Sequence, residues 1–439
     1  SRGRVGRRIG GGAAVSAMFA SLATPNYRRY FTGVLLSNVG LWIGRTAATW
    51  LVLVELTAGD LGAVGVLTGL MFLPALLLSA TAGTLADRFP KRTIMMAAQS
   101  VALLDATALG VLTLTHTIQL WMVFAITLID GVAGSLDSPA RQAFVSELVE
   151  PARLPNAIGL NSASWNAARL LGPGLAGVLI ALVGTGPVFL IGTVTFAIQI
   201  WALASLDADG LQPVARPPRE RGGVRQGLAY VRSRPELMVL LLVGFMMGNF
   251  AFNYAITNPA MSTYVFGKGP TEFGVLGSLM GAGALAAALL SAARARPRLR
   301  HIIASMAAYA VVQGVSGLAP TFETFALLQV PLGLTSITAV VTANTLLQTA
   351  LDDEVRGRVM ALWMLFLLGA APVVSPLVGW IGTAFGPRAT VQVGTVSIGL
   401  FCAALVAYLM VHEGVRLRLR LSARRPVAVY YVAAPTEPR

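Results

Sequence analysis

Long apolar segments recur along almost the whole chain, and they constrain its fold more than any other feature. Windows of about 20 apolar residues, the length that crosses roughly 30 Å of hydrocarbon as a helix, follow one another over most of the sequence. Hydrophobic residues make up 55% of the 439 residues and charged residues 12%, with a mean hydropathy of +0.71. An aqueous core cannot bury so much apolar surface, so the sequence predicts an all-α membrane protein.

Glycine, proline and charged residues divide these segments into twelve predicted transmembrane helices, here called spans one to twelve. The first six lie at 29–56, 62–86, 93–115, 119–140, 154–183 and 187–206, and the second six at 236–266, 271–293, 301–319, 322–350, 357–385 and 387–412. The predicted organisation is a disordered cytoplasmic tail (1–28), a six-helix bundle (29–206), a cytoplasmic linker with an amphipathic helix (207–235), a second six-helix bundle (236–412) and a basic cytoplasmic tail (413–439).

The net charge of +14 follows the predicted topology. All but four of the 33 Lys and Arg residues fall in the tails and in the loops after even-numbered spans; the exceptions are Arg45, Arg169, Lys268 and Arg388. Because basic residues in short loops stay on the cytoplasmic side, we expect both termini in the cytoplasm and an inner-membrane location. The basic residues do not gather with aromatic ones, which argues against nucleic-acid binding. One cysteine and three scattered histidines predict neither a disulfide nor a metal site, and no cofactor is expected.

The two bundles repeat each other at an offset of about 203 residues. Matched positions include Arg153 with Arg356 and Pro173 with Pro376, and two glycines follow in each half. A parallel duplication predicts pseudo-symmetric halves with a substrate site between them near the bilayer midplane. Access to that site is expected to alternate by rocking.

The loop after span two forms the first of two local motifs that resemble those of a known family. The loop after span two and a polar position on span four supply the residues of a predicted inner gate: Gly83, Asp87, Arg88, Lys91, Arg92 and Asp137. An acid near a helix end can hold basic partners, and we expect Asp137 to hold Lys91 or Arg92. The alternative is a solvated basic loop. The pattern resembles the signature loop of the major facilitator superfamily, although Pro90 stands where that loop usually has glycine.

Span five carries Gly172, Pro173 and Gly177, which resemble the Gly-Pro motif of exporters in that superfamily. Proline removes one helical hydrogen bond and the glycines admit a neighbouring helix, so we expect a kink that acts as hinge and seal. The alternative is that Gly and Pro are simply frequent in membrane helices.

Four longer stretches of sequence resemble one branch of this superfamily in particular. The runs 25–31, 45–53, 140–144 and 356–361 are similar to the branch that contains the enterobactin exporter and the macrolide and tetracycline efflux pumps. The resemblance extends from Met18 to about residue 412 and implies a twelve-helix major facilitator fold and proton-coupled efflux of a drug or siderophore. Thr49 stands where relatives often have an acid, which argues against a proton role for span one.

Four ionisable residues are predicted within roughly 10 Å of the bilayer midplane: Arg45, Asp105, Asp130 and Arg169. A charge in hydrocarbon is costly unless it is paired or hydrated, so each is a functional candidate. We expect Asp130 to pair with Arg45 and to release it on protonation; the alternative is a static buried ion pair. Asp105 is expected either to neutralise Arg169 or to be a second proton site.

Polar and aromatic side chains are expected to surround a sizeable amphipathic substrate. These residues are Asn38, Trp42, Thr49, Trp165, Asn249, Asn253, Thr342, Trp363 and Phe366. The predicted function is export of a lipophilic or amphipathic small molecule in exchange for protons, by a monomer in contact with membrane lipids. Proton-coupled or passive uptake is the alternative. An intramembrane enzyme is not expected, because the spans offer no nucleophile with a base and no clustered metal ligands.

Overall fold

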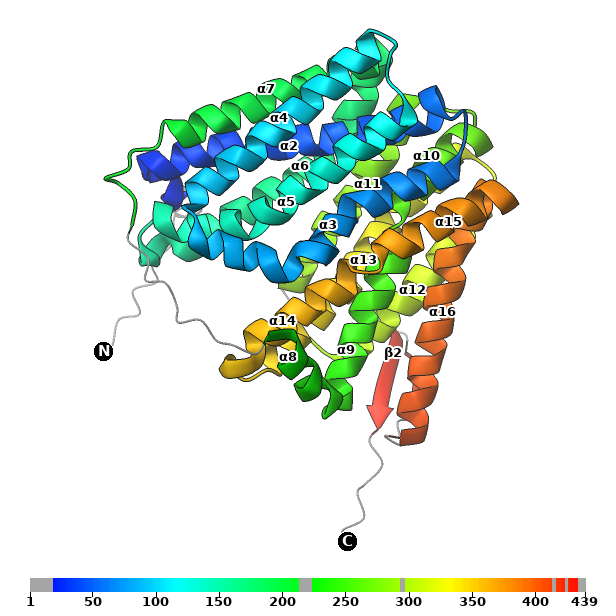
Figure 1. The fold of residues 1–439 in the computed structure, drawn as a ribbon. Helices are drawn as coiled ribbons and strands as arrows, with labels where there is room; N and C mark the ends of the chain where they lie inside the picture. The colour runs from blue at the N-terminus through cyan, green and yellow to red at the C-terminus, as the bar shows by residue number, and fades with distance from the viewer. Residues whose placement is uncertain (1–18, 213–222, 293–296, 413–415, 423–424, 433–439) are drawn as a thin grey trace, which may run out of the picture. The chain divides into compact units, whose positions relative to one another are not determined.

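The structure, a computed structural model, describes residues 19–212, 223–292, 297–412, 416–422 and 425–432 (Figure 1). Side chains of residues 79–88, 223–225, 292, 353–354 and 412 onward lie outside this description. Eleven helical segments of the described chain are long and apolar enough to cross a membrane. The remaining predicted span, span nine, corresponds to α12 (Leu299–Gly317), whose first turn contains the polar residues Arg300 and His301. The predicted all-α, twelve-span architecture is therefore confirmed.

The chain divides into two compact units. The N-terminal unit comprises residues 1–57, 70–219 and 270–274, and the C-terminal unit comprises residues 58–69, 220–269 and 275–439. The start of span two thus groups with the C-terminal unit, and the start of span eight groups with the N-terminal unit. Each unit has its own buried core.

The helices of spans one to six agree closely with the predicted segments. They are α2 (Pro25–Trp50) with the π-helical continuation η2 (Leu51–Leu56), α3 (Leu61–Arg88), α4 (Lys91–Leu114), α5 (Leu120–Leu148), α6 (Leu154–Val183) and α7 (Thr185–Ala204). Short 3₁₀ turns, η1 (Ala20–Ala23) and η3 (Pro151–Arg153), precede α2 and α6. In this unit α7 packs against both α2 and α4, which Figure 1 shows side by side. Span four extends past its predicted end at 140 to Leu148, and its last turns bury the apolar side chains of Phe144, Val145 and Leu148.

The helices of spans seven to twelve follow a linker helix, α8 (Gly223–Arg232), at the position of the predicted amphipathic helix. They are α9 (Pro235–Met246), η4 (Met247–Ala251), α10 (Tyr254–Ala260), η5 (Met261–Val265), α11 (Pro270–Ala292), α12, α13 (Phe322–Thr349), α14 (Asp353–Leu368), α15 (Ala371–Phe385) and α16 (Pro387–His412). Spans seven and eleven are each interrupted, which the hydropathy pattern does not reveal.

The repeat is visible in the backbone. Gly184 ends α6 with φ +80°, and its counterpart Gly386 ends α15 with φ +90°. This left-handed conformation costs glycine little and other residues more, so both halves use glycine to stop the fifth helix of the bundle before the sixth begins.

One feature of the tail was not predicted. Residues expected only as a basic tail contain an antiparallel hairpin, β1 (Arg416–Ser422) paired with β2 (Arg425–Val432). The predicted tail 1–28 includes the start of α2, and its first 18 residues lie outside the described chain.

Candidate functional site

Charged side chains of the N-terminal unit form a connected group along α5 and its neighbours. Asp130 lies within electrostatic range of Arg45 on α2 and of Asp137, and Asp105 on α4 lies within range of Asp130. Helical spacing explains the arrangement on α5, because positions 130, 137 and 141 are seven and four residues apart, about two turns and one turn, and share a face. Asp130 thus lies within range of both Arg45 and Asp105, and a shared role of these residues stays a prediction.

Arg141 is the best-connected member of this group. Its Nε and Nη2 donate to Asp137 Oδ2 at 3.0 and 2.6 Å, and its Nη1 donates to Asn38 Oδ1 at 3.4 Å. The Asn38 amide in turn donates to Ser164 Oγ at 3.1 Å. A hydrogen-bonded chain therefore joins α5, α2 and α6, with the Asp137 side chain 11% exposed and that of Arg141 21% exposed.

The predicted contact of Asp137 with Lys91 or Arg92 is wrong. Asp137 pairs with Arg141, one helical turn further along α5. Lys91 instead pairs with Glu147 near the end of α5. An i,i+4 partner on the same helix is held in place at little cost in chain entropy, whereas Lys91 at the start of α4 is nearest the last turn of α5.

Arg92, the second basic residue of the predicted gate, binds a backbone carbonyl of α7. Arg92 Nη2 donates to the Ala204 carbonyl at 2.8 Å, near the end of α7. Carbonyls in the last turn of a helix have no helical partner, so a guanidinium is a suitable donor there. The side chains of Gly83, Asp87 and Arg88 lie outside the described residues.

The expected ion pair between Arg45 and Asp130 is not among the salt bridges of the described side chains, which are formed by Lys91, Arg141 and Arg234. Their interaction is at longer range. The Arg45 guanidinium lies 5.6 Å from the centre of the Trp42 ring, a cation-π distance. Trp42 meets Trp165 edge to face at 5.8 Å.

Asp105 and Arg169 are not joined. Asp105 Oδ2 is buried and has no hydrogen-bond partner among the described residues. Arg169 on α6 is half-buried and is absent from the same set of salt bridges. Asp105 therefore forms no salt bridge with Arg169 among the described side chains, and its second predicted role, a proton site, stays a prediction.

The predicted substrate-facing residues divide into two kinds. Trp165 is 38% exposed and Trp42 is half-buried. By contrast, Trp363 is 0% exposed and packs against Gly244, where an added Cβ would come within 2.7 Å of its ring. Trp363 therefore belongs to the core of the C-terminal unit.

The remaining predicted residues are occupied within their own units. Asn249 donates to the Phe366 carbonyl at 2.9 Å, and the Phe366 ring packs edge to face on Phe245 at 6.3 Å. Asn253 accepts from Ser375 at 3.1 Å, and the buried Thr49 donates to the Arg45 carbonyl at 3.0 Å. Thr342 is 4% exposed.

The glycines of the span-five motif mark close helix approaches. A Cβ at Gly172 would come within 2.5 Å of the Trp42 Cβ, and one at Gly177 within 3.1 Å of the Gly274 Cα at the start of α11. At both positions a neighbouring helix lies too close for a larger side chain, while the predicted role of the motif as hinge and seal stays a prediction. Pro173 lies inside α6, which continues through it as one helix of 30 residues.

Sequence reasoning missed two contributors to this region. Glu147 partners Lys91, and Glu55 in η2 accepts a hydrogen bond from Thr185 at the start of α7. Both acids sit near segment ends, where hydropathy gives no reason to single them out. The Asp137-to-Arg141 spacing was a visible signal for the pair on α5.

Comparison with known proteins gives a consistent assignment. The staphyloferrin A transporter of Staphylococcus aureus is 23% identical over 90% of this chain and 98% of its own length. The enterobactin exporter EntS of Citrobacter koseri is 24% identical, covering 90% and 94%. The multidrug efflux pump Tap of Mycobacterium tuberculosis is 25% identical, covering 85% and 90%.

A solved structure supports the fold. The inward-facing, unoccupied bacterial homologue of the human lysosomal transporter Spinster aligns with a TM-score of 0.63 at 14% identity, over 88% of this chain and 95% of that one. Residues 16–424 match the family described as transmembrane secretion effector. The twelve spans, the paired units and these matches agree, and the chain belongs to the transmembrane secretion effector family of major facilitator superfamily transporters.

Proposed function

We propose that this transporter exports a lipophilic or amphipathic small molecule from the cytoplasm in exchange for protons. The observation that carries the proposal is the group of three carboxylates, Asp105, Asp130 and Asp137, that interact electrostatically with one another or with two arginines inside the membrane-spanning part of one unit. Carboxylates that interact with one another disfavour simultaneous ionisation. A proton on one acid therefore changes the interactions of its neighbours.

The residues have separable roles in this scheme. Two guanidinium nitrogens of Arg141 donate to Asp137 Oδ2, and we assign this pair the role of holding α5 in the hydrogen-bonded chain with Asn38 and Ser164. Asp130 and Asp105 have no such partner, and Asp105 Oδ2 makes no hydrogen bond among the described residues. We assign the exchanging proton to these two acids, with Arg45 as the cation whose interaction with Asp130 weakens on protonation.

The direction and substrate class rest on the relatives and on aromatic surface. The named relatives are a transporter, an exporter and an efflux pump, and their names give staphyloferrin A, enterobactin and multiple drugs as substrates. The Trp42–Trp165 pair offers amphipathic rings beside Arg45, a surface that suits an aromatic or partly charged molecule. The distribution of Lys and Arg supports an inner-membrane location with both termini cytoplasmic, and we propose a monomer surrounded by lipid.

The test compares Asp130→Asn with the native protein. A substrate is first selected from lipophilic dyes, macrolides and siderophores by accumulation in everted vesicles energised with acid inside. With purified protein in weakly buffered detergent, that substrate should release protons from the native chain and release few from Asp130→Asn. The matched control is Asp209→Asn, which removes an exposed carboxylate from the same unit.

Unchanged proton release in Asp130→Asn would remove that residue from the mechanism, and the same assay on Asp105→Asn would then test its neighbour. Uptake is tested in right-side-out vesicles. If acid outside drove the substrate inward, export would be the wrong direction.

A further inference from the structure

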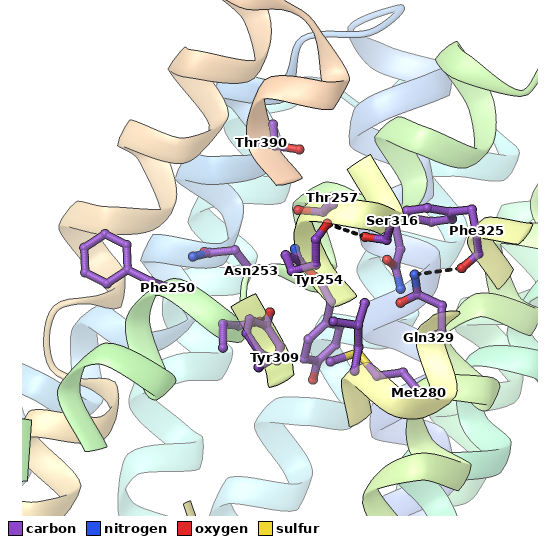
Figure 2. A pocket seen from close by; sticks show the side chains of 14 residues that line it. Phe250, Asn253, Tyr254, Thr257, Met280, Tyr309, Ser316, Phe325, Gln329 and Thr390 are labelled. Carbon is purple, nitrogen blue, oxygen red and sulfur yellow. Dashed lines mark hydrogen bonds between the residues drawn. The ribbon is translucent and has the colours of Figure 1, made fainter. Parts of the chain in front are cut away.

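Span seven is interrupted inside the C-terminal unit, and a small cavity lies beside the interruption (Figure 2). The segments α9 and η4 end at Ala251, and α10 begins at Tyr254, so two residues between them leave helical geometry. Lipid cannot satisfy the backbone groups that such a break frees, so they must find partners within the protein. The counterpart of this span in the first bundle, α2, runs for 26 residues without interruption, so the break is specific to the second half of the repeat.

Specific side chains satisfy part of the break. Tyr309, 1% exposed on α12, donates its hydroxyl to the Ala251 carbonyl at 3.0 Å. Asn253 donates to the Asn249 carbonyl at 2.6 Å and accepts from Ser375 on α15 at 3.1 Å. Tyr309 and Asn253 also line the cavity, so these bonds fix part of its wall.

Buried, uncharged polar side chains from span seven, α12, α13 and α16 line the cavity. Besides Asn253 they are Thr257, Asn258, Gln313, Ser316, Gln329 and Thr390, each less than a tenth exposed. The described lining includes no Asp, Glu, Lys, Arg or His, so it holds no charge that would balance an ion. The space admits about one water molecule. An occupant that fits is therefore small and neutral.

Part of the lining offers oxygen lone pairs. Ser316 and Thr390 donate their hydroxyl hydrogens to backbone carbonyls of their own helices, at 2.8 and 2.7 Å. Gln329 donates one N–H to the Phe325 carbonyl at 3.3 Å, a bond that Figure 2 draws. The two hydroxyl oxygens and the Gln329 amide oxygen remain as acceptors.

Amide N–H groups supply the opposite polarity. Asn258 on α10 is 3% exposed, and its Nδ2 has no hydrogen-bond partner among the described residues. Gln329 Nε2 carries a second hydrogen besides the one that it donates to Phe325. Because an unpaired buried donor is costly, buried amides are normally satisfied. Asn258 therefore needs an acceptor, and the cavity that it lines is where one can lie.

A water molecule matches this combination of donors and acceptors. It can accept a hydrogen bond from Asn258 Nδ2 and donate to the hydroxyl and amide oxygens across the cavity. A cation would meet N–H groups and an anion would meet lone pairs, and the described lining has no opposite charge for either. We propose that the cavity binds one water molecule, which joins Asn258 on α10 to side chains of α12 and α13 as a fixed part of the C-terminal unit.

The direct test is a density map of the purified full-length protein that resolves ordered water, with hydroxyl-radical footprinting by a brief X-ray pulse as a readout in solution. Irradiated water forms hydroxyl radicals that oxidise adjacent side chains, so a buried methionine is labelled fastest where water lies beside it. Met280 is 4% exposed and lines the cavity, whereas Met306 is 0% exposed and lies outside the lining. We expect one density peak within hydrogen-bond distance of Asn258 Nδ2, and oxidation of Met280 at least threefold faster than that of Met306.

Two variants test the bridge itself. Asn258→Leu removes the unpaired amide, and Thr257→Val removes a hydroxyl of the lining with little change in volume. In each, the oxidation rate of Met280 should fall towards that of Met306. The matched control, Thr335→Val, removes a hydroxyl of α13 that donates to the Pro331 carbonyl and lies outside the lining, so it should leave Met280 oxidation unchanged.

A native map without density in the cavity, or oxidation of Met280 as slow as that of Met306, would overturn the proposal. Density whose neighbours are all oxygen atoms would also overturn it, because such a set of neighbours identifies a cation. Unchanged Met280 oxidation in both cavity variants would refute the bridge through Asn258. The proton-release assay of Asp130→Asn concerns the N-terminal unit, so failure of that proposal is distinguishable from failure of this one.

Discussion

Removing the charge of Asp137 should destabilise the N-terminal unit by about 2–3 kcal/mol. Asp137 Oδ2 accepts two hydrogen bonds from Arg141, at 3.0 and 2.6 Å. In Asp137→Asn an amide oxygen can take the place of Oδ2, so both bonds persist without the negative charge. A hydrogen bond to a charged group contributes roughly 1.5–3 kcal/mol against about 0.5–1.5 for a neutral one, so each bond loses about 1–1.5 kcal/mol. Both side chains are less than a third exposed, so solvent screening is limited.

The assay is thermal unfolding of the purified protein, followed by tryptophan fluorescence. For a unit of this size about 1 kcal/mol corresponds to roughly 2–4 °C, so the midpoint should fall by about 4–12 °C. Asp209→Asn, which removes an exposed carboxylate, should leave the midpoint within about 1 °C.

A double-mutant cycle separates the pair from other effects. Arg141→Gln should cost much less in the Asp137→Asn background than in the native chain. In the native chain it leaves the Asp137 carboxylate buried without a cation, whereas in Asp137→Asn that carboxylate is already absent. Equal costs in the two backgrounds, or an unchanged midpoint for Asp137→Asn, would refute the argument that this pair stabilises the bundle.

Three further predictions test packing and polar contacts. Gly333→Ala on α13 should lower the unfolding temperature by several degrees, since its Cβ would press on the α11 backbone, whereas Gly134→Ala, with open space around it, should be neutral or stabilising by up to about 1 kcal/mol. Tyr309→Phe should cost about 1–3 kcal/mol in chemical unfolding by leaving a buried carbonyl at the span-seven break unpaired; a cost below about 0.5 kcal/mol would show that the bond is dispensable. Glu147→Gln should cost about 1 kcal/mol, less than Asp137→Asn, because Lys91 makes one hydrogen bond to Glu147 whereas Arg141 makes two to Asp137; added salt should reduce the difference from the native chain.

The span positions were predictable because membrane crossing depends on local sequence. Twenty apolar residues form a helix of the required length whatever their neighbours are, and the predicted ends of α6 and α3 agree with the structure to within two residues. Interruptions within a span were not predictable from hydropathy. The break at Phe252 and Asn253 lies in an apolar segment, and it persists because Tyr309 and Ser375, distant in sequence, satisfy the freed groups.

The sequence identified which charged residues lie at membrane depth, but it identified their interaction partners only in part. A charge at membrane depth is conspicuous in any sequence, so Asp105, Asp130 and Arg45 were found. The pairings failed, because whether Asp137 reaches Lys91 or Arg141 depends on helix rotation and packing, which hydropathy does not contain. Trp363 was expected at a substrate surface and is a core residue for the same reason.

The sequence by itself determined the number and order of the spans, the charge bias of the loops, the internal repeat and the presence of ionisable groups in one half, because each depends on composition along the chain. Only the tertiary structure decided which charges meet, which aromatic rings are buried, and that a cavity lined by buried, uncharged polar groups adjoins the broken span seven. Those features depend on contacts between residues far apart in the chain, and such contacts form only when the helices pack.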